Sequence, residues 1–115
     1  MSLLSELTDI VSALDIPVET GVFSDKAPNT YVVIVPISES FDLQADDKPN
    51  INIEEARLSL FSKGNYTAVK NTLVRSLLTA DYTITARQYI GYETDTGYHH
   101  YNIDVSQFYE IQEEN

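Results

Sequence analysis

The sequence has no cysteine and no tryptophan, and it contains only four glycines and one methionine in 115 residues. Without cysteine the chain can form neither a disulfide framework nor a thiolate metal site. None of the four glycines belongs to a glycine-rich loop that would cradle a phosphate. No serine stands in a G-x-S-x-G motif, which marks one class of nucleophile. Several common signatures of enzymes are therefore missing.

Positive charge is also scarce. Lysine and arginine number 7 against 18 aspartates and glutamates, so the formal net charge is −11. A chain this acidic is not expected to bind nucleic acid through its phosphates. No apolar run approaches the length of a membrane span, and the first residues lack the basic stretch and apolar core of a signal peptide. These features predict a soluble intracellular protein that does not associate with membranes.

Apolar residues are present in normal amount, since they make up 43% of the chain. That fraction and the length predict one domain, residues 1–115, with a single core. A domain of this size gains limited stability from its own burial, so association with other subunits would stabilise it further.

Two segments have the three- and four-residue apolar spacing of amphipathic helices. The first covers residues 2–14 and the second residues 66–80. Ser2 and Asn65 stand where an N-cap is expected, because their side chains can accept a hydrogen bond from the first turn. Glu6 is expected on the solvent face of the first helix.

The remaining apolar segments have the composition of strands. Residues 31–37 are β-branched almost throughout, and a short segment at 18–23 is expected to pair with them as a hairpin, because residues 24–29 have a turn composition. The alternation over 82–92 places its apolar residues on one face, and Gly97 suits the turn that follows. Strands are predicted over residues 18–23, 31–37, 51–61, 82–92 and 98–111.

The predicted order is α-β-β-flap-β-α-β-β. It gives an α+β fold in which two helices pack on a single, mainly antiparallel sheet. The flap, at about residues 38–53, is a long acidic segment that carries Phe41 and Leu43 between acidic residues. Connections of this length without a role are uncommon in small domains. Apolar residues change from odd to even positions around Glu54–Glu55, which predicts a bulge or a bend there and makes the flap a bent, projecting ribbon.

The sequence gives little indication of a catalytic or metal-binding site. The adjacent pairs His99–His100 and Glu54–Glu55 lie on predicted strands, where neighbouring side chains point to opposite faces and do not converge. Asp42, Asp46 and Asp47 lack the glycine and terminal glutamate of a calcium loop. We therefore expect no catalytic, cofactor-binding or metal-binding site, and no enzyme activity.

Charge is distributed unevenly along the chain. Both ends and the flap are acidic, whereas residues 56–90 contain five basic residues and one acidic residue. One interpretation is that these are ordinary solvated surfaces. The other is that they are complementary patches that guide one subunit onto the next.

The overall layout resembles the tail terminator proteins of long-tailed bacteriophages and prophages, also called tail-completion or head-to-tail joining proteins. The matching phrases span nearly the whole chain but form no invariant motif. They are IPVETGVFSDKAPNTYVVI (Ile16–Ile34), FDLQADDKPNINIEEARLSLFSKG (Phe41–Gly64), NYTAVKNTLVRSLL (Asn65–Leu78) and YHHYNIDVSQFYEI (Tyr98–Ile111).

The resemblance implies a structural virion assembly protein without catalytic residues or cofactors. Such proteins form a homo-oligomeric ring, typically of six subunits, at the head-proximal end of the tail tube. The ring ends tail polymerisation and joins the tail to the head. The implied partners are further copies of the chain, the major tail tube protein and a head-completion or connector protein. The implied location is the host cytoplasm during assembly and then the head–tail junction of the virion.

A ring needs two different surfaces on each subunit. We expect the flap to supply one surface, with apolar anchors and acidic side chains, and the basic block to supply the other. Reversing the charges of Asp46 and Asp47 should then weaken assembly and leave the fold intact. The expected interface residues are Glu39, Phe41, Asp42, Leu43, Asp46, Asp47, Lys63, Lys70 and Arg75.

Two alternatives remain open at the level of the sequence. The chain could be another head–tail connector or head-completion protein of the same particle. It could also be an acidic inhibitor that mimics DNA, although its acidic residues cluster in the flap and at the termini instead of following one surface.

Overall fold

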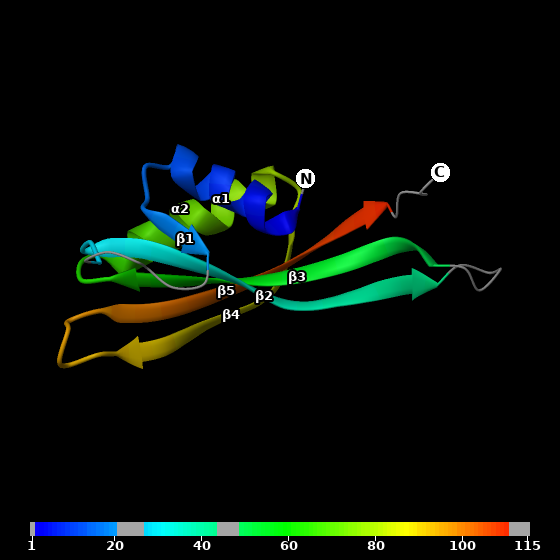
Figure 1. Cartoon of the computed structure of the whole chain (residues 1–115). Coiled ribbons are helices and arrows are strands. Elements are labelled where there is room, and N and C mark those ends of the chain that lie inside the picture. Colours follow the sequence, from blue (N-terminus) through cyan, green and yellow to red (C-terminus); the bar gives the residue numbers. More distant parts are fainter. Residues whose placement is uncertain (1, 21–26, 44–48, 111–115) are drawn as a thin grey trace.

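The structure is a computed structural model that describes residues 2–20, 27–43 and 49–110. It has a mixed α+β fold with one five-stranded, mostly antiparallel sheet and two helices on one side of it, as the sequence predicted (Figure 1). The elements in chain order are α1 (Leu3–Ala13), β1 (Val18–Thr20), β2 (Thr30–Leu43), β3 (Pro49–Ser62), α2 (Tyr66–Thr79), β4 (Thr83–Tyr92) and β5 (His99–Glu110).

Both helices begin where the sequence predicts. The Ser2 hydroxyl accepts a hydrogen bond from the Ser5 amide, and the Ser5 hydroxyl accepts one from the Ser2 amide, so α1 has a reciprocal cap. The Asn65 side chain accepts from the Ala68 amide and caps α2 in the same manner. α1 ends just before Asp15, whose φ of 61° lies in the left-handed region and cannot continue the helix.

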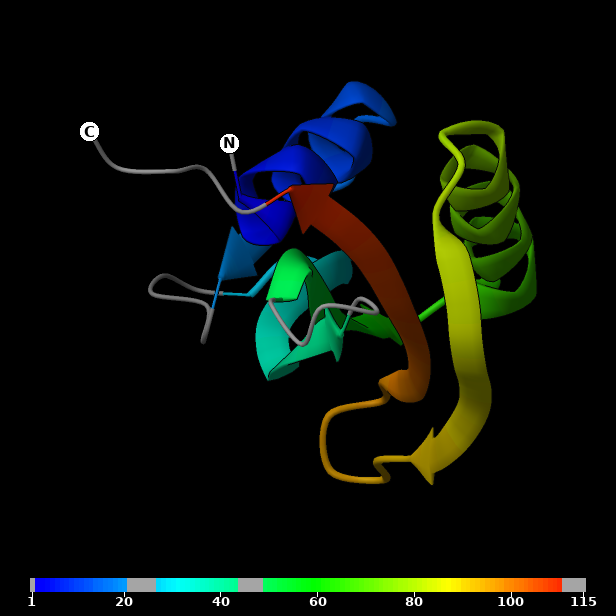
Figure 2. The same cartoon turned by 90° about the vertical axis from the view of Figure 1, so that its right-hand side faces the viewer.

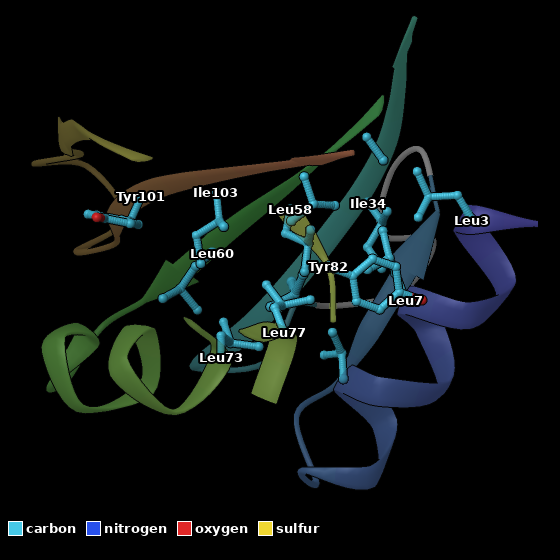
Figure 3. Close-up of a cluster of buried hydrophobic side chains, with 14 residues drawn as sticks. Leu3, Leu7, Ile34, Leu58, Leu60, Leu73, Leu77, Tyr82, Tyr101 and Ile103 are labelled. Carbon is cyan, nitrogen blue, oxygen red and sulfur yellow. The ribbon is translucent and has the colours of Figure 1, made fainter. Parts of the chain in front are cut away.

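The core lies between the helices and the central strands (Figure 3). α1 contributes Leu3, Leu7 and Val11 at three- and four-residue spacing, and α2 contributes Leu73 and Leu77. The remaining core side chains come from the sheet and from the start of β4. They are Val32, Ile34, Ala56, Leu58, Leu60, Tyr82, Tyr101, Ile103 and Val105.

The strand order is β1-β2-β3-β5-β4. The prediction that the first two strands form a hairpin is wrong, because β1 runs parallel to β2, with Val18 opposite Val32. The parallel direction lets the chain leave α1 and place Val18 against the core beside it. Turn composition indicates that a chain bends, but the direction of the strand before it is decided by packing.

The segment predicted as a flap is largely paired strand, since β2 continues to Leu43 and β3 already begins at Pro49. Of the bulge or bend expected in β3 near Glu54–Glu55, the bulge is absent from β3 and lies in the partner strand β2 instead. Ile37 is the extra residue, because Pro36 pairs with Ala56 while Ser38 pairs with Glu55. β3 itself pairs with β5 without any shift in register. The change of its apolar residues from odd to even positions therefore marks the point where the strand leaves the core.

β4 is also less regular than the sequence predicted. Its pairing with β5 shifts at two places, between Ile84 and Ala86 and between Tyr89 and Gly91. Each extra residue turns the following side chains to the other face, so the apolar residues of β4 do not share one face. The hairpin turn is as predicted, with Gly97 in the left-handed region at φ 82° and its amide bound to the Glu93 carbonyl.

Candidate interaction surfaces

The longest projection of the molecule is formed by β2 from Pro36 to Leu43 together with β3 from Pro49 to Glu55, which we call the distal ribbon. It extends beyond both helices and contributes to a molecule with extents of 53 × 25 × 24 Å (Figure 1). Among the distal-ribbon residues whose side chains the structure describes, none belongs to the buried core cluster. Ile37 is 44% exposed and Phe41 is 61% exposed, so the distal ribbon presents apolar side chains to its surroundings.

Several of the predicted interface residues lie on the distal ribbon. Glu39 is exposed on β2 and lies directly opposite Glu54 on β3. Like charges placed directly opposite on neighbouring strands destabilise the pair unless another charge offsets them. For Asp42 and Leu43 the structure describes the backbone alone, at the end of β2, and Asp46 and Asp47 lie outside the described residues.

A surface groove of about 470 Å³ lies where the distal ribbon leaves the cover of α1. The bulge at Ile37 and the first turn of α1 form its apolar part, and three glutamates are among its lining residues. The complete lining is Ser2, Leu3, Leu4, Pro36, Ile37, Ser38, Glu39, Glu54, Glu55 and Ala56. Sequence reasoning missed this groove, because it joins an N-terminal helix to strands more than thirty residues away.

The polar contacts of the groove carboxylates are with neutral groups. The Ser38 hydroxyl donates to Glu55 Oε1 over 3.1 Å, and the Asn52 amide donates to Glu54 Oε2 over 3.3 Å. Among the described residues the only ion pair joins Arg57 to Asp104, with Nε and Oδ1 2.8 Å apart. The negative charge of the groove is therefore not offset by a basic side chain within the described part of the subunit.

The three predicted basic residues lie away from the distal ribbon. Lys63 follows β3, and its Nζ lies 4.9 Å from the centre of the Tyr98 ring. Lys70 on α2 holds its Nζ 5.3 Å from the centre of the Tyr101 ring. Such contacts position an ammonium group but leave its charge available. Within the part of the chain that the structure describes, Glu39 forms no ion pair with any of these three basic residues.

Arg75 lies on the outer face of α2, on the opposite side of the helix from Leu73 and Leu77. It is exposed, and the neighbouring Leu78 is 55% exposed. α2 contains no acidic residue. A second surface depression runs along this outer face and is lined by Asn71, Val74, Arg75, Leu78 and Thr79.

Aromatic side chains gather at the end of the sheet away from the distal ribbon. His99 lies against Tyr66, Tyr89 and Tyr92 on the side of the helices, with ring centres 4.8–6.1 Å apart. His100 stacks on Phe61 on the other face, at 4.3 Å. The two histidines therefore point to opposite faces, as predicted from their strand position.

One glutamate has a different environment from the one predicted. Glu6 was expected on the solvent face of its helix, but it is partly buried, and its Oε1 accepts hydrogen bonds from Tyr82 at 2.7 Å and Tyr109 at 2.8 Å. Burial and these hydrogen bonds raise the pKa of both tyrosines well above their ordinary value. The carboxylate therefore ties α1 to the start of β4 and to the end of β5.

The sheet face without helices carries paired polar side chains. Arg57 donates to both oxygens of Asp104, at 2.8 and 3.0 Å, and the Ser59 hydroxyl donates to the Asn102 side chain at 2.9 Å. These pairs join β3 to β5 and neutralise charge across the face. Among the residues that the structure describes, no cluster of three or more histidines, cysteines or carboxylates is arranged to hold a metal ion.

No family model matches the sequence, and no curated protein matches it. A search of the helices among the described residues found none long and apolar enough to cross a membrane.

Proposed function

We propose that this chain is a structural subunit that assembles into a ring at the head-proximal end of a phage tail, where it ends tail polymerisation and joins the tail to the head. The observation that carries this proposal is the separation of two exposed surfaces with different chemistry on an elongated domain. The distal ribbon is acidic and apolar, and the helix α2 is basic and apolar.

This separation supports a head-to-tail contact. Two complementary surfaces on separate parts of one subunit allow that subunit to bind further copies of itself. Repeated contacts of this kind form a closed ring when the rotation between neighbouring subunits allows it. Electrostatic attraction between the two surfaces would favour the correct partner and orientation. The net negative charge would keep the ring from gripping DNA that passes through it.

Partners and location follow from the same proposal. Phe41 and the end of the distal ribbon contact a neighbouring subunit or the tail tube protein, and a head-completion or connector protein occupies the other side of the ring. The assembly takes place in the host cytoplasm and the ring remains in the virion. The exposed side chain of Phe41 supports such a contact, because an aromatic side chain on a projecting ribbon can bury its apolar surface against a partner.

Tail length measures this function directly. Removing the gene from the phage or prophage that carries it should give overlong tail tubes without heads, and supplying the chain should restore uniform length. A Glu39→Lys chain should restore length poorly, because the reversed charge weakens the acidic surface. Asp95→Lys, an exposed reversal in the β4–β5 turn, is the matched control. Tails of normal length without the chain would contradict the proposal, and electron microscopy of the tails gives the measurement.

A further inference from the structure

The groove beneath the N-terminus of α1 has an apolar part that remains accessible. Ile37 is pushed out of regular pairing by the bulge and stays 44% exposed, although it lies beside Leu3 and Leu4. The adjacent carboxylates of Glu39 and Glu54 face each other across the two strands. An occupant that fits this groove carries an apolar side chain for Ile37 and a positive charge for the two glutamates.

The outer face of α2 has both features one helical turn apart. Leu78 is 55% exposed, and Arg75 precedes it by three residues, so the two side chains lie side by side on the same face. The absence of any acidic residue from α2 means that nothing on this helix would repel the glutamates of the groove.

We propose that the groove is occupied by the outer face of α2 from a second copy of the chain, with Leu78 against Ile37 and Arg75 between Glu39 and Glu54. This inference rests on the proposed ring and specifies which surfaces meet in it. Charge complementarity and the matched pair of exposed apolar side chains select this occupant. The contact also relieves the repulsion between the two glutamates, which the described part of one subunit leaves uncompensated.

The two surfaces have no residue in common within one subunit. Figure 2 shows α1 and α2 on opposite sides of β5 when the molecule is viewed from the end of the distal ribbon. The groove lies beside α1, and the Leu78 face of α2 is turned away from the core that both helices cover. The contact is therefore heterologous, which is the type that generates rings.

Because the chain has no cysteine, introduced cysteines identify this contact without background. Purified Ile37→Cys and Leu78→Cys chains are mixed at high concentration under mild oxidation. Both positions are exposed, so neither substitution should disturb the fold, and circular dichroism checks this. We expect a disulfide-linked dimer that contains one chain of each kind. Gln88→Cys, exposed on β4 away from both helices, replaces Leu78→Cys in the control and should give only the yield of random collision.

Charge reversal tests the orientation of the same contact. Adding Arg75→Glu to the Leu78→Cys chain should lower the rate of dimer formation about tenfold, and adding Glu39→Lys to its partner should restore most of it. Dimers of Ile37→Cys with itself, or a mixed yield no higher than the Gln88→Cys control, would overturn the inference. Neither result affects the tail-length experiment, so a ring built through other surfaces would still show its effect on tail length.

Discussion

At the scale of single residues, Glu6 shows how environment changes the role of a charged side chain. Its position on the helix predicts a solvated carboxylate, yet two tyrosine hydroxyls from distant parts of the chain donate to one of its oxygens. Hydrogen bonds to a charged acceptor stabilise a fold more than those between neutral groups. Glu6 therefore holds three elements together instead of solubilising one of them.

Removing this carboxylate should destabilise the domain. Glu6→Ala leaves two partly buried hydroxyls without their acceptor, so we expect the free energy of unfolding to fall by about 2–3 kcal/mol. Asp9→Ala, which removes an exposed carboxylate from the same helix, should change it by less than about 0.5 kcal/mol. Urea denaturation at pH 7 measures both. Equal effects of the two substitutions would contradict the role assigned to Glu6.

The same cluster predicts a response to alkaline pH. The pKa of Tyr82 and Tyr109 is raised in the folded state by burial and by the hydrogen bonds to Glu6, so unfolding releases protons once the pH exceeds the ordinary tyrosine value of 10.0. The stability that these tyrosines contribute is fully present below that value and is lost as the pH rises above it. Unfolding free energies measured from pH 8 to 11 should be level first and then fall, and Tyr82→Phe should make the fall shallower.

At the scale of elements, the β4–β5 hairpin depends on one glycine. Gly97 has a φ of 82°, a backbone conformation that residues with a Cβ rarely adopt. Its amide donates a hydrogen bond to the Glu93 carbonyl over 2.7 Å and so closes the turn. By contrast, Gly64 has no positive φ and has open space where a Cβ would stand. The two glycines therefore form a matched pair for testing backbone strain.

Gly97→Ala should lower the melting temperature, because alanine in the left-handed region costs about 1–2 kcal/mol. Gly64→Ala should leave it nearly unchanged or raise it slightly, since alanine restricts the unfolded chain there without strain in the folded one. Thermal unfolding followed by circular dichroism distinguishes the two variants. A stable Gly97→Ala chain would show that the turn does not need the left-handed conformation.

At the scale of the whole molecule, the core stabilises the fold, and the distal ribbon has the proposed role in assembly. Between Ile34 and Ala56, no residue with a described side chain belongs to the core cluster, so that part of the distal ribbon adds length without adding to the core. Ordering such a projection costs conformational entropy, so we propose that a contact outside the subunit uses it. The proposed ring gives that use.

Shortening the distal ribbon should separate the two properties. Replacing residues 40–53 with Asn-Gly leaves Glu39 opposite Glu54 and supplies a two-residue hairpin turn. We expect the shortened chain to remain folded, with a lower melting temperature because residues 51–53 pair with Phe108–Glu110, and to lose control of tail length. A shortened chain that still gives tails of uniform length would show that the distal ribbon takes no part in assembly.

The local features of this protein could be predicted from its sequence. Apolar spacing located both helices, Ser2 and Asn65 marked their first turns, and alternation located the strands that make the fold class α+β. These signals are local because a cap or a periodic face depends on residues within a few positions of one another. The exposed acidic segment that carries Glu39 and Phe41 was visible for the same reason.

Only the tertiary structure decided how these elements meet. The parallel direction of β1, the bulge at Ile37 instead of near Glu54–Glu55, and the tyrosine partners of Glu6 all depend on contacts between residues far apart in the chain. The groove beside Ile37 exists only because α1 returns over the strands at their bulge. Sequence patterns determine which face of an element is apolar, but packing determines which partner covers it and which surface remains open for another subunit.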